Sequence, residues 1–92
     1  MRVFVSRPLP EEAMQRLARR FEIAVGPADR PTTAEELREG ARDADAIVSM
    51  LSDRIDAGLL AGCPKLRIVA NYAVGFDNVD LAAAEARGIW VT

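Results

Sequence analysis

Residues 66–92, LRIVANYAVGFDNVDLAAAEARGIWVT, contain the pattern that decides the fold. The apolar run 66–70 predicts a buried strand. A loop over 71–77 comes next, then a helix that ends at Gly88, and a second β-rich run covers 89–92. A strand joined through a helix to another strand is the building unit of a parallel sheet.

The same alternation extends back to the start of the chain. Further strands are predicted over residues 2–5, 21–25 and 46–50. Helices are predicted over 11–20, from a capping box at 33–36 through Ala44, between Asp56 and Gly62, and from Asp80 or Asn78 to Arg87. The pattern predicts an α/β fold with a doubly wound, flavodoxin-like parallel sheet of five strands.

The order of elements also predicts an uncovered surface. A flavodoxin-like domain usually has a helix after its fifth strand, whereas this sequence ends with the strand at Thr92. We expect the sheet to lack its last covering helix and to expose apolar area on one face. Either a partner or the remainder of a longer chain is expected to cover that face, and we expect the isolated chain to form a homo-oligomer.

The composition argues against several classes of function. The 92 residues carry a net charge of −2 and include no histidine, which removes the commonest general base and metal ligand. A single cysteine allows no internal disulfide and no cysteine metal cluster, so no metal site is expected. Acidic and basic residues are interleaved, which disfavours nucleic-acid binding. With no long apolar run and no secretory signal, we expect no membrane partner and a cytoplasmic protein.

Ligands of such a sheet bind at its carboxyl edge, and the sequence lacks the residues that most of these ligands need. No Gly-x-Gly-x-x-Gly motif opens a helix, so no cofactor-binding residue is predicted. A phosphoacceptor site needs acidic residues where the sequence has Ser6-Arg7 and Ser49-Met50. Cys63 has no adjacent base and is interpreted as a small apolar residue in a turn.

The loop over residues 71–78 is the remaining candidate. Gly75 permits backbone conformations that other residues avoid. The N–H groups of Val74, Gly75 and Phe76 could converge on one anion, and a small carboxylate would suit them. The alternative is that Gly75 only makes a turn and that Asp77 caps the next segment of the chain.

At this loop the sequence resembles a known family. The segments LRIVANYAVGFDNVD (66–80), AAAEARGIWVT (82–92), VFVSRPLP (3–10) and MLSDRID (50–56) closely resemble the D-isomer-specific 2-hydroxyacid dehydrogenases. Within that family they look most like the glyoxylate/hydroxypyruvate reductase branch. The resemblance covers the whole chain.

The resemblance implies that residues 1–92 are the N-terminal segment of a substrate-binding domain. The NAD(P)-binding Rossmann domain, which would hold NAD or NADP, lies outside this chain. The family's catalytic arginine, histidine and glutamate also belong to later sequence, so no catalytic residue is carried over. The implied reaction is hydride transfer from the nicotinamide to a small 2-oxo acid, glyoxylate or hydroxypyruvate, giving the D-2-hydroxy acid.

The resemblance also assigns substrate-binding residues. Backbone N–H groups at Val74 and Gly75 would bind the substrate carboxylate. Leu51 and Ser52 match the loop that lines the substrate pocket, and Tyr72 lies near it. The alternative function is a stand-alone, non-catalytic flavodoxin-like binding module. On either interpretation we expect the isolated chain to have no dehydrogenase activity.

Overall fold

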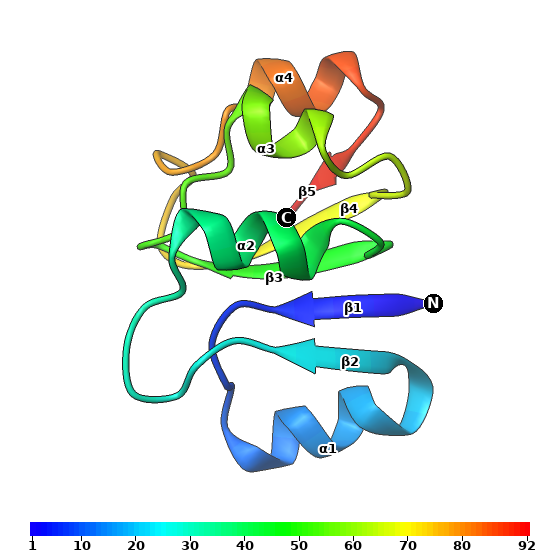
Figure 1. Ribbon diagram of the computed structural model, residues 1–92, viewed down its shortest axis with the longest axis vertical. Coiled ribbons are helices and arrows are strands. Elements are labelled where there is room, and N and C mark those ends of the chain that lie inside the picture. The colour runs from blue at the N-terminus through cyan, green and yellow to red at the C-terminus, as the bar shows by residue number, and fades with distance from the viewer.

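A computed structural model describes residues 1–92 as one five-stranded sheet with helices on both faces (Figure 1). The strands are β1 (Arg2–Val5), β2 (Glu22–Val25), β3 (Ala46–Met50), β4 (Ile68–Tyr72) and β5 (Trp90–Val91). The helices are α1 (Glu11–Arg20), α2 (Ala34–Ala41), α3 (Ala57–Ala61) and α4 (Leu81–Ala86). All pairings are parallel and the strand order is β2-β1-β3-β4-β5, which confirms the flavodoxin-like topology.

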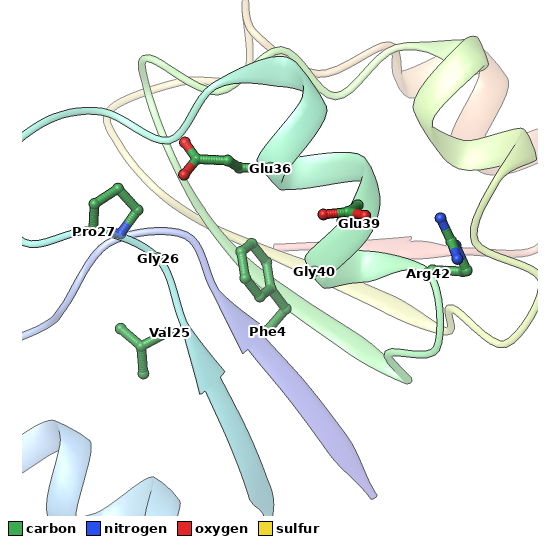
Figure 2. A pocket seen from close by; sticks show the side chains of 8 residues that line it. All are labelled: Phe4, Val25, Gly26, Pro27, Glu36, Glu39, Gly40 and Arg42. Atoms are coloured by element: carbon green, nitrogen blue, oxygen red, sulfur yellow. The ribbon is translucent and has the colours of Figure 1, made fainter.

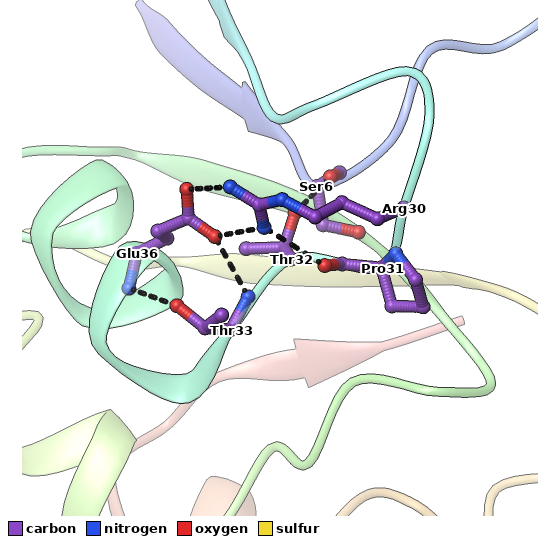
Figure 3. A network of polar contacts seen from close by, with 6 residues as sticks. All are labelled: Ser6, Arg30, Pro31, Thr32, Thr33 and Glu36. Atoms are coloured by element: carbon purple, nitrogen blue, oxygen red, sulfur yellow. Dashed lines mark hydrogen bonds and ion pairs between the residues drawn. The ribbon is translucent and has the colours of Figure 1, made fainter.

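Side-chain caps determine where three of the helices begin. Thr33 and Glu36 form the predicted capping box of α2, and Arg30 pairs with Glu36 through two hydrogen bonds of 2.7 and 2.9 Å (Figure 3). Asp56 accepts from the backbone of α3. For α4 the sequence left two caps open, and the structure selects Asp80.

Two predicted elements differ from the structure by more than one residue. The strand predicted over 66–70 is β4, Ile68–Tyr72, because the Leu66 N–H is taken by a turn to the Cys63 carbonyl. The helix predicted to reach Ala44 stops at Ala41, and a turn carries Ala44 into the core. Both errors come from buried apolar residues that belong to turns rather than to the neighbouring element.

The two faces of the sheet are covered unequally. Fourteen buried residues form the core on the face covered by α2, α3 and α4. On the α1 face only Val3, Val5 and Ala46 are buried, with partly buried side chains of α1 packed against them. No helix covers β4 and β5 on that face, and Trp90 is 75% exposed. Within these 92 residues, that part of the sheet is therefore exposed.

Gly40 allows α2 to lie close to the sheet. A Cβ at this position would fall 2.3 Å from Cε1 of Phe4, so the ring of Phe4 occupies the space that a side chain would need. Figure 2 shows the Phe4 ring directed toward this turn of the helix. The intrinsic helix cost of glycine is therefore offset by the packing of a buried aromatic side chain.

The structure contains no helix with the length and apolar character needed to span a bilayer.

Candidate functional site

The parallel register brings two of the sequence-predicted segments to one edge of the sheet. Met50, the last residue of β3, pairs with Tyr72, the last residue of β4. Leu51 and Ser52 therefore follow β3 at the carboxyl edge, where residues 73–75 follow β4. Figure 1 shows both loops leaving the same end of the sheet. Open α/β sheets bind ligands at this edge.

The backbone of Val74 and Gly75 makes no hydrogen bond through its N–H groups within the chain. The loop donates instead from Ala73 to the Asn71 carbonyl and from Val79 to the Phe76 carbonyl. Gly75 has φ = 81°, in the region that favours glycine. The position of its missing Cβ is open, with no atom within 4 Å. Two adjacent donors thus stand unpaired at a surface that a ligand can approach closely.

The side chains predicted to lie near the substrate are exposed. Val74 is fully exposed, and Leu51 and Tyr72 are 60% and 63% exposed. Tyr72 ends β4 instead of lying in the loop. None of these residues lines a cavity of the chain. Within these 92 residues the site is an open surface.

The largest cavity lies away from this edge site. It has a volume of about 600 Å³ and lies between α2 and the end of β2 (Figure 2). Glu36 and Glu39 supply its acidic groups. Glu36 is already paired with Arg30, and that hydrogen bond holds the pKa of the Glu36 carboxyl down to about 2. Only two of its eight lining residues are hydrophobic, whereas small-molecule sites are lined mostly by apolar side chains.

A pair of asparagines connects the two predicted substrate loops. Asn71 and Asn78 exchange side-chain hydrogen bonds of 2.9 and 3.0 Å. Asn71 also donates to the Gly75 carbonyl at 3.2 Å. Asn78 donates to the carbonyls of Met50 and Asp53, the residues on either side of the Leu51–Ser52 pair. The sequence reasoning did not identify this pair.

Asp53 braces the loop after β3 from inside the molecule. The residue is 3% exposed, and its carboxylate accepts hydrogen bonds from the Ser6 hydroxyl and from the Met50 N–H, the latter at 2.7 Å. The Thr32 hydroxyl in turn donates to the Ser6 carbonyl (Figure 3). These contacts satisfy a buried carboxylate without a cation. The sequence alone gives no sign of this role, because Ser6 and Thr32 lie far from Asp53 in the chain.

The structure agrees with the interpretation of Cys63 as a packed apolar residue. Its side chain belongs to the main core, and burial raises the pKa of the thiol. The Sγ atom contacts the Leu59 carbonyl at 3.3 Å. No group of three or more acidic, cysteine or histidine side chains is arranged to hold a metal ion.

Comparisons with known proteins point to one family. The model of the catalytic domain of D-isomer-specific 2-hydroxyacid dehydrogenases matches residues 3–92. The glyoxylate reductase of Thermococcus gammatolerans is 50% identical over 91 residues, and that of Pyrococcus furiosus is 47% identical. Each match covers 99% of this chain and 27% of the relative, so the chain spans about a quarter of their length.

Solved structures agree with the sequence relatives. A protein from Thermus thermophilus superposes with a TM-score of 0.93 at 40% identity, over all of this chain and 30% of its own. A 2-hydroxyacid dehydrogenase from Ketogulonicigenium vulgare gives 0.77 at 30% identity, over 99% of this chain and 28% of its own. The fold described above is therefore one that this family uses.

Proposed function

The chain belongs to the D-isomer-specific 2-hydroxyacid dehydrogenase family, and we propose that it is the N-terminal segment of the substrate-binding domain of an NAD(P)-dependent oxidoreductase. The proposed reaction reduces a small 2-oxo acid, glyoxylate or hydroxypyruvate, to the D-2-hydroxy acid. The family match along the chain and the glyoxylate reductases among its relatives support this proposal.

The observation that carries the proposal is the pair of unpaired N–H groups at Val74 and Gly75. A carboxylate that accepts from both would gain two charge-assisted hydrogen bonds, which are stronger than those between neutral groups. Its position at the carboxyl edge would place Leu51 and Ser52 beside the rest of the substrate. Fixing the carboxylate in this way would orient the neighbouring carbonyl for reaction.

The residues of this chain do not fit a dinucleotide cofactor. The turn after β1 contains no glycine, and the Ser6 N–H that could face a phosphate donates to the Val48 carbonyl. We therefore assign NAD or NADP to a separate domain, where the nicotinamide would supply the hydride. The proton donor of the reaction is assigned there too, because this chain contains no histidine. The role proposed for the chain is to bind and orient the acid.

Nuclear magnetic resonance can test the carboxylate site directly. The ¹⁵N-labelled chain is titrated with oxamate, a 2-oxo acid analogue, and with acetamide, a neutral control of similar size. We expect oxamate to shift the amide signals of Val74 and Gly75 while acetamide leaves them in place. Equal shifts with both compounds, or shifts confined to other residues, would contradict the proposal.

A chimera tests the enzymatic role. Residues 1–92 replace the matched segment of the Thermococcus gammatolerans glyoxylate reductase, to which they are 50% identical. We expect the chimera to oxidise NADH or NADPH with glyoxylate. A folded chimera that binds the cofactor but reduces no 2-oxo acid would count against the proposal.

The alternative, a stand-alone binding module, makes a different prediction about the gene. A reading frame that continues beyond Thr92 into a Gly-x-Gly-x-x-Gly segment supports the split-domain enzyme. A stop codon at that point supports the module.

A further inference from the structure

The side chains of Asn71 and Asn78 use almost all of their hydrogen-bonding capacity on each other and on the two predicted substrate loops. Asn71 Nδ2 donates to Asn78 Oδ1 at 2.9 Å and to the Gly75 carbonyl at 3.2 Å. Asn71 Oδ1 accepts from Asn78 Nδ2 at 3.0 Å and from the Ser49 hydroxyl at 2.8 Å. A side-chain amide offers two donor hydrogens and an acceptor oxygen with two lone pairs, so all four positions of Asn71 are filled.

Asn78 carries the contact to the other loop. Its Nδ2 donates to the Met50 carbonyl at 3.0 Å and to the Asp53 carbonyl at 2.9 Å. These two residues flank Leu51 and Ser52. The Asn78 backbone adds a further link, since its carbonyl accepts from the Ile55 N–H at 2.9 Å.

We propose that Asn71 and Asn78 form an amide clasp that positions the Val74 and Gly75 N–H groups for the substrate carboxylate. The inference rests on the proposed function, because it assigns a cause to the geometry of that same site. The hydrogen bond to the Gly75 carbonyl fixes the Gly75–Phe76 peptide, which follows the Val74 and Gly75 N–H groups directly in the chain. The bonds from Asn78 to Met50 and Asp53 fix the loop after β4 relative to the loop after β3. Asn71 and Asn78 are positioning residues under this proposal, since neither needs to touch the acid.

The chemistry of the clasp requires amides. Nδ2 of Asn78 faces three oxygen acceptors, and Nδ2 of Asn71 faces two. A carboxylate at either position would place oxygen against oxygen, and an apolar side chain would leave the Gly75 carbonyl without its partner. Asn78 is half-buried, so leaving its Oδ1 unpaired is costly, whereas the exposed Gly75 carbonyl is free to turn toward water. The loop is therefore expected to rearrange when the donor is removed.

The substitution Asn71→Leu tests this directly, because leucine has nearly the same shape and no hydrogen-bonding group. Thr33→Ala is the matched control, since it removes the cap of α2 and thereby destabilises the fold, while the Thr33 side chain makes no hydrogen bond to Asn71, Asn78 or the loop after β4. The first readout is the ¹⁵N order parameter of residues 74 and 75 in the ligand-free chain. We expect Asn71→Leu to lower it from a rigid value of about 0.85 to below about 0.6, and Thr33→Ala to leave it unchanged.

The second readout is the affinity for oxamate and the kinetics of the chimera. We expect Asn71→Leu to weaken oxamate binding and to raise KM for glyoxylate about tenfold, the effect of losing roughly one hydrogen bond to a charged group. KM for the nicotinamide cofactor should stay constant. Asn71→Asp, which keeps the acceptor contacts with Ser49 and Asn78, serves as a second variant if Asn71→Leu does not fold, and the same direction is expected.

The outcomes separate this proposal from the proposed function. A rigid loop in Asn71→Leu, or a fall in kcat with both KM values unchanged, would mean that Asn71 serves stability alone and would overturn the clasp. If oxamate shifts no signal at Val74 and Gly75 in the unsubstituted chain, the proposed function fails. In that case the order parameters still decide whether the clasp orders the turn.

Discussion

Replacing Gly75 by alanine separates backbone strain from ligand contact. Gly75 has φ = 81°, and the site of its Cβ is open, so alanine would meet no atom of the chain. The cost to stability is therefore conformational only. A left-handed backbone costs a non-glycine residue about 1–2 kcal/mol, and part of this is offset because alanine restricts the unfolded chain. We expect a net loss of about 1 kcal/mol, which lowers Tm by about 4–8 °C in a domain of this size.

Gly88 provides the matched control. It has φ = 69° and an equally open Cβ site, but it lies between α4 and β5, away from the predicted carboxylate site. Gly88→Ala should therefore lower Tm by a similar amount. The two variants should differ in binding, because only the methyl group at position 75 would occupy the space that the carboxylate needs.

Calorimetry and the oxamate titration together show whether the carboxylate binds next to Gly75. We expect both variants to unfold at a lower temperature than the unsubstituted chain, and only Gly75→Ala to lose oxamate affinity, by at least about tenfold for a displaced charge-assisted contact. Equal affinities in the two variants would show that no ligand approaches Gly75, and the proposed docking point would be refuted.

Other parts of the molecule give three further predictions. The uncovered face of β4 and β5 should drive self-association of the isolated chain, so sedimentation should show species larger than the monomer. Trp90→Glu should restore the monomer, and an unsubstituted chain that stays monomeric at high concentration would contradict the prediction. Ionised Glu36 stabilises the fold through Arg30, because the pKa of its carboxyl falls from 4.5 to about 2 on folding. This stabilisation is complete above pH 4.5 and is lost as the pH falls through about 2. Acid unfolding of Glu36→Gln should lack this pH-dependent loss of stability, and an acid transition identical to that of the unsubstituted chain would contradict the prediction. The isolated chain should oxidise neither NADH nor NADPH with glyoxylate in an absorbance assay, because it contains no histidine and no dinucleotide motif; measurable turnover by the pure chain would overturn the split assignment.

The sequence predicted the fold because its apolar pattern is local and regular. Each strand is a short apolar run, and Thr33, Asp56 and Asp80 cap the following helices through contacts three residues away. Errors arose where a buried residue lies in a turn. Leu66 is 6% exposed and sits ahead of β4, so periodicity alone assigned it to the strand. The role of Gly40 is not visible in the sequence, because glycine ordinarily weakens a helix and its packing partner Phe4 lies far away in the chain.

The polar part of the site could not be predicted in the same way. Asn78 reaches carbonyl groups 25 and 28 residues earlier, and Asn71 meets Ser49 across 22 residues. Every residue has a backbone carbonyl, so the residue types in a sequence do not indicate which carbonyls accept side-chain hydrogen bonds. The only indication of the pair in the sequence is that Asn71 and Asn78, the only asparagines in the chain, lie on either side of the loop that contains Gly75.

The clasp also bears on how β3 and β4 pair. In the observed register Ser49 pairs with Asn71, and both lie on the face covered by α2, α3 and α4, two residues beyond the buried Ile47 and Val69. A slip of one residue would move every side chain of β4 to the opposite face. Asn71 would then lie on the sparsely covered α1 face, without Ser49 or Asn78, and Val69 would leave the main core. Apolar burial and the amide contacts therefore favour the same register. That register also brings the end of β3, where the Leu51–Ser52 loop begins, next to the end of β4, where the Val74–Gly75 loop begins. The pairing that forms the sheet and the geometry of the proposed site therefore depend on the same few residues.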